Sequence, residues 1–242
     1  MNNSTIEVIN LITEYNTSKV NLTDKIAKIE NSFSKNLIDP IEMLEFLNQE
    51  KLSKELIPTY LHVHTFHLLK RSKLLQVQQQ LKLYFPQEFV SCLGKNPNYY
   101  SKLESLLSNH DFFEADRVTQ GLLSDLAVQN CSNRKWLYFT EVRKIKNEDL
   151  YQIDLLWDLY SQGQFGISIQ KKLWLTCDKN WQKFWEKIGW INHNDYKKYP
   201  EEFTWNLQAP KGHLPLFNQL RGVETLEALF NHPVWTSCSP TT

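Results

Sequence analysis

The first 93 residues of this 242-residue chain contain no glycine and no tryptophan, although the whole chain has seven glycines and eight tryptophans. A change of composition this abrupt predicts two units with different roles. The glycine- and proline-containing stretch from Pro86 to Pro97 is the expected boundary. We therefore predict an N-terminal domain at residues 1–90 and a second domain at residues 98–236.

The sequence also lacks an excess of either charge, because 27 lysines and arginines balance 27 aspartates and glutamates. A chain without a bulk positive field has no general means of concentrating phosphates, so nucleic acid is not an expected partner. Its 41% hydrophobic and 22% charged residues are those of an ordinary globular protein. This composition excludes the disordered and fibrous classes.

Cysteines are few and far apart, at positions 92, 131, 177 and 238. Their spacing predicts no metal knuckle, and a chain of this size needs no disulfide staples, so we interpret them as reduced thiols. The N-terminus has neither the pattern of a signal peptide nor that of a transit peptide. No stretch approaches the roughly 18 apolar residues of a membrane span, which leaves peripheral membrane association open.

Common catalytic motifs are missing as well: there is no GxSxG, no Walker phosphate loop, no dinucleotide glycine fingerprint and no HExxH. His64 and His67 share a helix face, but no cysteine or acidic cluster completes a metal site, so none is predicted. Glu201 and Glu202 are adjacent rather than facing, and they nominate no catalytic pair. The chain is expected not to be an enzyme.

Helical patterns are what the sequence does contain. Apolar residues recur at helical spacing through most of the chain, and no alternating run is long enough for a sheet. Asp39 before Pro40 predicts one helix start, and Gly163 and Gly189 are expected to end two helices. The predicted fold class is all-α, with an N-terminal helical bundle and a C-terminal helical domain.

The helical periodicity fails between Trp190 and Pro215, although this stretch is dense in aromatic residues. Long loops are usually functional or disordered, and the aromatic density argues against disorder. The stretch could form the wall of a ligand site or a satellite core beneath the loop. Arg221, directly before Gly222, is equally open: it could grip a carboxylate in two-pronged fashion or cap a helix end.

Several passages resemble a known family. They are RKWLYFTEV (134–142), GQFGISIQKKLWL (163–175), FWEKIGW (184–190) and FTWNLQAPKGHLPLFNQLRGV (203–223), with HDFFEAD (110–116) and HPVW (232–235) in the matching order. Together they resemble the genomes-uncoupled-four family, tetrapyrrole-binding regulators of magnesium chelatase in oxygenic phototrophs. The resemblance covers about residues 98–236 and implies an all-helical, porphyrin-binding domain shaped like a cupped hand, with a variable helical unit before it.

Site residues follow from this resemblance position by position. It implies that Phe139 and Val142, one helical turn apart, lie on a hydrophobic palm that binds protoporphyrin IX or Mg-protoporphyrin IX. A mobile loop is expected to cover the palm, and Arg221 is expected at the propionates of the ligand. Tyr199 stands where related sequences often have a tryptophan, so the stacking area there should be smaller. The full expected ligand-binding set is Phe139, Val142, Trp190, Tyr199, Phe203, Leu214, Leu216, Asn218 and Arg221.

The function that the resemblance implies is that of a non-catalytic regulator and porphyrin carrier. Such a protein stimulates magnesium chelatase in chlorophyll biosynthesis by exchanging porphyrin with the large porphyrin-binding subunit of that enzyme. Three alternatives stay open: a linear tetrapyrrole (bilin) in the same cleft, a haem enzyme with His213 as axial ligand, and a helical adaptor without ligand. The abundance of Asn and Lys and the lack of a transit peptide favour the plastid stroma for a plastid-encoded protein, with a cyanobacterial cytoplasm as the alternative.

Overall fold

The computed structural model describes residues 3–15, 21–53, 56–91, 97–128, 137–192, 195–217 and 223–237. The chain divides into two compact units, unit 1 at residues 1–101 and unit 2 at residues 102–242. The expectation that residues 1–90 and 98–236 form separate domains stays a prediction. The fold is all-α, as predicted: the strands among the described residues are two of two residues each, β1 (Ile191–Asn192) and β2 (Asp195–Tyr196).

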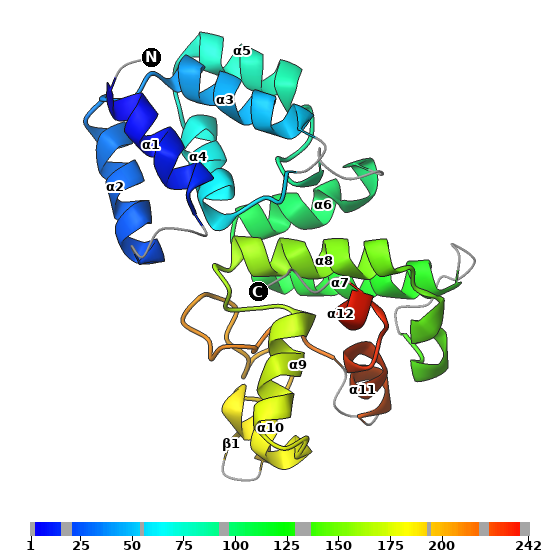
Figure 1. Ribbon diagram of the computed structural model, residues 1–242. Coiled ribbons are helices and arrows are strands. Elements are labelled where there is room, and N and C mark those ends of the chain that lie inside the picture. The colour runs from blue at the N-terminus through cyan, green and yellow to red at the C-terminus, as the bar shows by residue number, and fades with distance from the viewer. Residues whose placement is uncertain are drawn as a thin grey trace. The chain divides into compact units, whose positions relative to one another are not determined.

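Unit 1 is built from amphipathic helices (Figure 1). They are α1 (Asn3–Thr13), α2 (Leu22–Ser34), α3 (Pro40–Leu52), α4 (Tyr60–Lys70) and α5 (Leu75–Tyr84), followed by α6 (Pro97–Ser108), which crosses the division between the units. The side chain of Asp39 accepts a hydrogen bond from the Ile41 amide at 2.8 Å, which confirms the predicted helix start. The core includes Ile12, Ile29, Leu47, Leu61 and Phe66, each at most 2% exposed.

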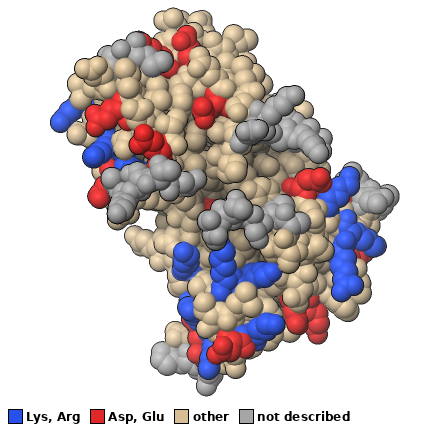
Figure 2. Space-filling model, viewed as in Figure 1, with Lys and Arg blue, Asp and Glu red and all other residues tan. Residues whose placement is uncertain are grey.

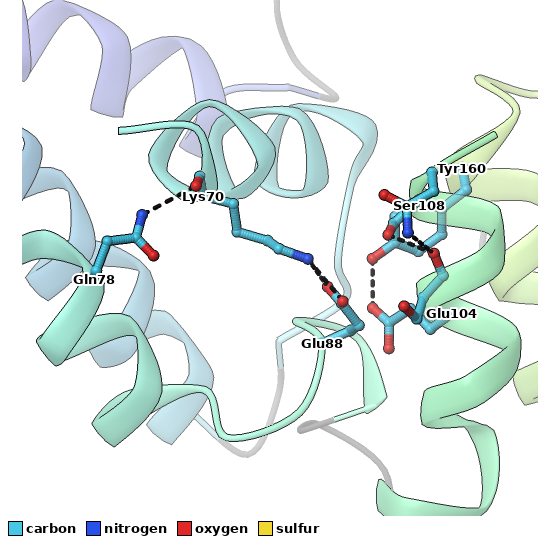
Figure 3. Close-up of polar contacts among 8 residues, drawn as sticks. Lys70, Gln78, Glu88, Glu104, Ser108 and Tyr160 are labelled. Carbon is cyan, nitrogen blue, oxygen red and sulfur yellow. Dashed lines mark hydrogen bonds and ion pairs between the residues drawn. The ribbon is translucent and has the colours of Figure 1, made fainter. Parts of the chain in front are cut away.

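Polar contacts in unit 1 join α4 to the segments around it. The Lys70 ammonium lies 2.7 and 2.9 Å from the two carboxylate oxygens of Glu88, and Gln78 donates to the Lys70 carbonyl (Figure 3). His62 and His64 face different carboxylates, those of Glu50 and Glu30. No group of three His, Cys, Asp or Glu side chains is gathered as a metal site requires, within the described ranges.

Unit 2 holds the remaining elements. They are α7 (Phe112–Val128), the 3-10 helix η2 (Phe139–Lys144), α8 (Asn147–Tyr160), α9 (Ile167–Thr176), α10 (Trp181–Lys187), the β1–β2 hairpin, α11 (Glu224–Phe230) and α12 (Val234–Ser237). Gly163 and Gly189 lie just beyond α8 and α10 with positive φ angles of 77° and 73°, so both predicted helix ends are confirmed.

The centre of unit 2 is formed by α7, α8 and α9. Trp157 of α8 is fully buried, and its indole N–H donates to the Thr119 hydroxyl of α7 at 2.9 Å. At the end of α8, the Tyr160 hydroxyl donates to the buried Glu104 carboxylate of α6 at 2.5 Å (Figure 3). These bonds satisfy polar groups that would otherwise be costly to bury.

The balanced net charge hides a local excess of one sign. Figure 2 shows lysine and arginine side chains gathered over the part of unit 2 where α9 and α10 lie. These two helices and the turn between them contain Lys171, Lys172, Lys179, Lys183 and Lys187. In the part of the chain that is described, no helix is both long and apolar enough to cross a membrane.

Candidate functional site

The aromatic stretch after β2 has no helix or strand from residue 197 to residue 217 (Figure 1). It consists of two parts that differ in burial. We call residues 197–208 the outer arm, because most of its residues reach solvent, and residues 212–217 the inner segment, because all six are buried. The outer arm carries Tyr199 and Phe203 of the predicted site, and the inner segment carries Leu214 and Leu216.

The inner segment is held by hydrogen bonds to its backbone from both sides. The side-chain amide of Gln170, on α9, donates to the carbonyls of Gly212 and Pro215 at 2.9 and 2.8 Å. The Trp190 indole donates to the His213 carbonyl at 2.8 Å, and the Gly166 amide donates to the Leu214 carbonyl at 3.1 Å.

Helix α7 holds the end of the inner segment at Leu216. The Leu216 amide donates to the Asp116 carboxylate at 2.6 Å, and Gln120 donates to the Leu216 carbonyl at 3.0 Å. All five carbonyls from Gly212 to Leu216 therefore accept a hydrogen bond. Leu214 and Leu216 therefore lie on a buried backbone segment that is hydrogen-bonded to α7, α9 and Trp190.

Asp116 is a fully buried carboxylate whose pKa burial raises from 3.8 to about 7, against the opposing effect of the hydrogen bonds from Leu216 and Gln120. Asp154 of α8 resembles it: burial raises its pKa to about 6, although the Ser168 amide donates to it at 2.9 Å. Desolvation outweighs hydrogen bonding at both positions, because each carboxylate has lost its water shell.

The raised pKa of Asp116 gives a testable dependence of stability on pH. Between about pH 4 and pH 7 the folded chain holds a proton on Asp116 that the unfolded chain has released, so this group's contribution to stability is lost as pH rises. Asp116→Asn removes this titration. Its unfolding free energy relative to the original chain should rise by roughly 2.5 kcal/mol from pH 5 to pH 8, since about two pKa units lie in this window and each is about 1.4 kcal/mol.

Urea unfolding followed by tryptophan fluorescence measures this difference in unit 2, because every tryptophan lies at or after position 136. Asp154→Asn tests the same effect at a second buried carboxylate. Its unfolding free energy relative to the original chain should also rise with pH, but the rise should end nearer pH 6. A difference between Asp116→Asn and the original chain that is the same at pH 5 and pH 8 would contradict the assignment.

The outer arm is an aromatic cluster that leans on the start of α7. The Phe113 ring centroid lies 5.0 Å from that of Trp205 and 6.3 Å from that of Tyr199, and the Trp205 indole donates to the Pro200 carbonyl at 3.0 Å. Tyr199 is nevertheless 51% exposed. The arm thus exposes the Tyr199 ring to solvent while its rings also pack against Phe113 of α7.

His213 is committed to the fold through both ring nitrogens. Nδ1 lies 2.7 Å from the Ile188 carbonyl, and Nε2 accepts from the Thr204 amide at 3.2 Å. His213 is fully buried, and this burial lowers the pKa of its ring. Neither nitrogen is available for a haem iron unless one of these bonds breaks, which argues against the axial-ligand alternative.

The 3-10 helix η2 packs against α7 and α11. Phe139 at its start is 51% exposed, whereas Val142 is fully buried. Both positions were predicted to lie on the palm, and the structure makes one an accessible ring and the other a supporting core residue. Phe139 can therefore be substituted with little direct cost to packing.

The other predicted site residues fall into two groups. The first group is buried in the interior of unit 2. It consists of Trp190, Phe203, Leu214 and Leu216, whose exposed fractions are 1%, 7%, 0% and 5%. Asn218 and Arg221 lie outside the described residues. The predicted set is thus brought together around α7 in part, with Phe139 and Tyr199 as its accessible rings.

Sequence reasoning did not single out the polar residues that fix the inner segment. The residues missed are Asp116 and Gln120 on α7 and Gln170 on α9. They were not candidates, because a polar residue on a predicted helix is usually assigned to the solvent-exposed face. A signal was present for Asp116, which lies within the recognised HDFFEAD passage and shares a helix face with Phe112, Ala115 and Thr119.

The chain was also compared with known proteins. A family model described as GUN4-like matches residues 94–233. A protein named uncharacterized protein ycf53, from Cyanidium caldarium, is 48% identical over 192 residues, 78% of this chain and 81% of that protein. The tetrapyrrole-binding protein, chloroplastic, of Arabidopsis thaliana is 37% identical over 147 residues, 57% of this chain and 56% of that protein. The structure of GUN4 from Chlamydomonas reinhardtii matches with a TM-score of 0.53 and 39% identity over 57% of this chain and 87% of that one.

Proposed function

The chain belongs to the GUN4-like family, and on that premise we propose that it binds a porphyrin, protoporphyrin IX or Mg-protoporphyrin IX, without converting it. The proposed role is to stimulate magnesium chelatase in chlorophyll biosynthesis by exchanging porphyrin with its large porphyrin-binding subunit. The chemistry of metal insertion belongs to that partner. We propose the plastid stroma as its location. This is supported by the similarity to a protein named ycf53 and to a tetrapyrrole-binding protein described as chloroplastic.

The observation that carries the proposal is the convergence of distant parts of the chain along α7. Tyr199 meets its first turn through Phe113, Leu216 is held at Asp116 and Gln120, and η2 with Phe139 packs against the same helix. With 17 residues at about 1.5 Å each, α7 is roughly 25 Å long. We infer that a flat apolar ligand lying beside α7 would contact the exposed rings of Tyr199, from the outer arm, and Phe139, from η2.

Energetics favour a ligand that is held and released. If binding removes roughly 300 Å² of apolar surface from water, the gross gain is about 7 kcal/mol before the cost of ordering the arm. A micromolar affinity needs about 8 kcal/mol. Charged contacts at the edge of the ligand add about 1.5–3 kcal/mol to this gross gain, against which the ordering of the arm must be set. We expect an affinity no tighter than about micromolar, which allows transfer to a partner.

A fluorescence titration tests the proposal directly. All eight tryptophans lie in unit 2, so a porphyrin bound there should quench their emission. Protoporphyrin IX and Mg-protoporphyrin IX are expected to quench with midpoints near micromolar, with haem and biliverdin as comparisons. Quenching by biliverdin alone would favour the linear tetrapyrrole, and the absence of quenching by all four would favour an adaptor without ligand.

A second prediction concerns Arg221, which the resemblance places at the propionates. Charged hydrogen bonds to a carboxylate contribute about 1.5–3 kcal/mol, so Arg221→Ala should weaken protoporphyrin binding roughly ten-fold or more. The melting temperature should barely change. The preference of the original chain for the free acid over its dimethyl ester should disappear in the variant, because the ester lacks the carboxylates.

Lys211→Ala is the matched control, since Lys211 is an exposed basic residue next to the inner segment. If Arg221 merely caps a helix end, Arg221→Ala would instead lower the melting temperature and leave the affinity unchanged. An undiminished preference for the free acid in Arg221→Ala, lost in Lys211→Ala, would move the propionate contact to the lysine.

A further inference from the structure

The outer arm is tied to the rest of unit 2 by few hydrogen bonds. At its start, the backbone amide of Lys197 donates to the Trp190 carbonyl at 3.0 Å. Beyond that point, within the described residues, the hydrogen bond from the Thr204 amide to His213 Nε2 is the one that leaves residues 198–208 for another segment. The remaining bonds of these residues, such as those from Glu202 and Phe203 to Lys198 and Pro200, stay inside the arm.

The hydrogen-bond partners fix the tautomer of His213. A carbonyl oxygen only accepts, so Nδ1 carries the proton and donates it to Ile188. An amide N–H only donates, so Nε2 is unprotonated and accepts from Thr204. The ring therefore joins two segments, the end of α10 and the outer arm, and its neutral form is required for both bonds.

His213 itself cannot follow the arm. Its carbonyl accepts from the Trp190 indole, its amide donates to the Pro210 carbonyl, and its ring is packed over Gly189, where an added Cβ would lie 3.6 Å from Nδ1 and 2.9 Å from Pro210. On the arm side, the centroid of the Phe203 ring lies 5.5 Å from that of the imidazole, with the two planes tilted by 46°. The His213 end of the contact is thus held by several hydrogen bonds, whereas the arm end is held by the Thr204 amide and the Phe203 ring.

We propose that His213 is a latch, a positioning residue that holds the outer arm with Tyr199 and Phe203 against the inner segment through Nε2. Releasing the arm breaks this one neutral hydrogen bond, the ring contact of Phe203 with His213, and the ring contacts of Tyr199 and Trp205 with Phe113. Moving the inner segment would instead break the hydrogen bonds at all five of its carbonyls. The effect of the latch on ligand affinity rests on the proposed tetrapyrrole binding, but the latch itself does not.

Two amide substitutions separate the two bonds of the ring. In His213→Asn the short side chain places its amide group near the position of Nδ1, so it keeps the bond to Ile188 and loses the latch. In His213→Gln the longer side chain reaches the position of Nε2, so its oxygen can still accept from Thr204. The two variants have the same functional group, which makes each the control for the other.

Limited trypsin digestion reports the position of the arm. Lys197 and Lys198 lie in it, and the exposed Lys172 and Lys183 of α9 and α10 are internal references. Cleavage after Lys197 and Lys198 relative to the references should be about five-fold faster in His213→Asn than in His213→Gln, the change expected from one neutral hydrogen bond. Equal rates in the two variants would overturn the latch.

Ligand affinity provides a second, independent measurement. Protoporphyrin IX should bind His213→Asn about five-fold more weakly than His213→Gln, because the arm must be ordered on binding. If the original chain fails to bind protoporphyrin while the digestion rates differ as expected, the proposed function fails and the latch stands. Equal affinities together with equal digestion rates overturn the latch alone.

A measurement on the original chain covers the case in which both variants unfold. Hydrogen exchange of the Thr204 amide, followed by NMR, should be slowed relative to an unprotected peptide, because this amide is hydrogen-bonded to His213. Exchange of Thr204 as fast as in an unprotected peptide would overturn the proposal without any substitution.

Discussion

Trp190→Ala is expected to lower the unfolding free energy of unit 2 by about 3–5 kcal/mol, the usual cost of deleting a large aromatic side chain from a core. Trp190 is 1% exposed, and its indole N–H donates to the His213 carbonyl at 2.8 Å. The substitution leaves a cavity beneath the inner segment and an unpaired buried carbonyl. Urea unfolding monitored by circular dichroism measures the loss.

Trp190→Phe separates the two causes, because it keeps most of the ring volume and removes only the hydrogen bond. Its cost should be about 1–3 kcal/mol, the penalty of an unsatisfied buried acceptor. A loss below about 1 kcal/mol for Trp190→Ala would show that the indole is not a core side chain. An effect of Trp190 on ligand affinity can be interpreted only in variants that remain folded.

The largest expected effect on binding is that of Phe139→Asp. A carboxylate placed under a flat apolar ligand loses its water without gaining a partner, at a cost of several kcal/mol, so affinity for every porphyrin should fall by roughly a hundred-fold. Because Phe139 is 51% exposed, the free protein should keep its melting temperature. Tryptophan quenching and thermal melting on the same sample measure both quantities.

Leu175→Asp is the matched control, since Leu175 is 45% exposed on α9 of the same unit and is not a predicted ligand contact. It should leave porphyrin affinity near that of the original chain. Unchanged affinity in Phe139→Asp would remove Phe139 from the site. A collapse of its melting temperature would instead mean that the ring supports the fold, contrary to its exposure.

Helices and their ends could be predicted from the sequence because their determinants are local. The Asp39–Pro40 start and the stops at Gly163 and Gly189 depend on residues within one turn of the helix. The inner segment could not be predicted in this way. Leu216 is fixed by Asp116, 100 residues earlier in the chain, and no periodic pattern links two such positions.

Burial of individual site residues was also beyond the sequence. The spacing of Phe139 and Val142 correctly suggests a shared helical turn, yet one ring is half exposed and the other side chain is fully covered. The difference comes from α7 and α11, which pack against η2 from distant parts of the chain. Spacing predicts which side chains are neighbours, whereas tertiary packing decides which of them a ligand can reach.

The hydrogen-bonded carbonyls of the inner segment also have a consequence for how the conformation of this segment is specified. Each carbonyl from Gly212 to Leu216 has a donor within the protein. A buried carbonyl that loses its donor costs about 1–3 kcal/mol, so any other conformation of this segment that leaves these acceptors unpaired is disfavoured by several such costs together. The segment has no helix or strand of its own, yet side chains and amides from distant elements give it a single backbone conformation.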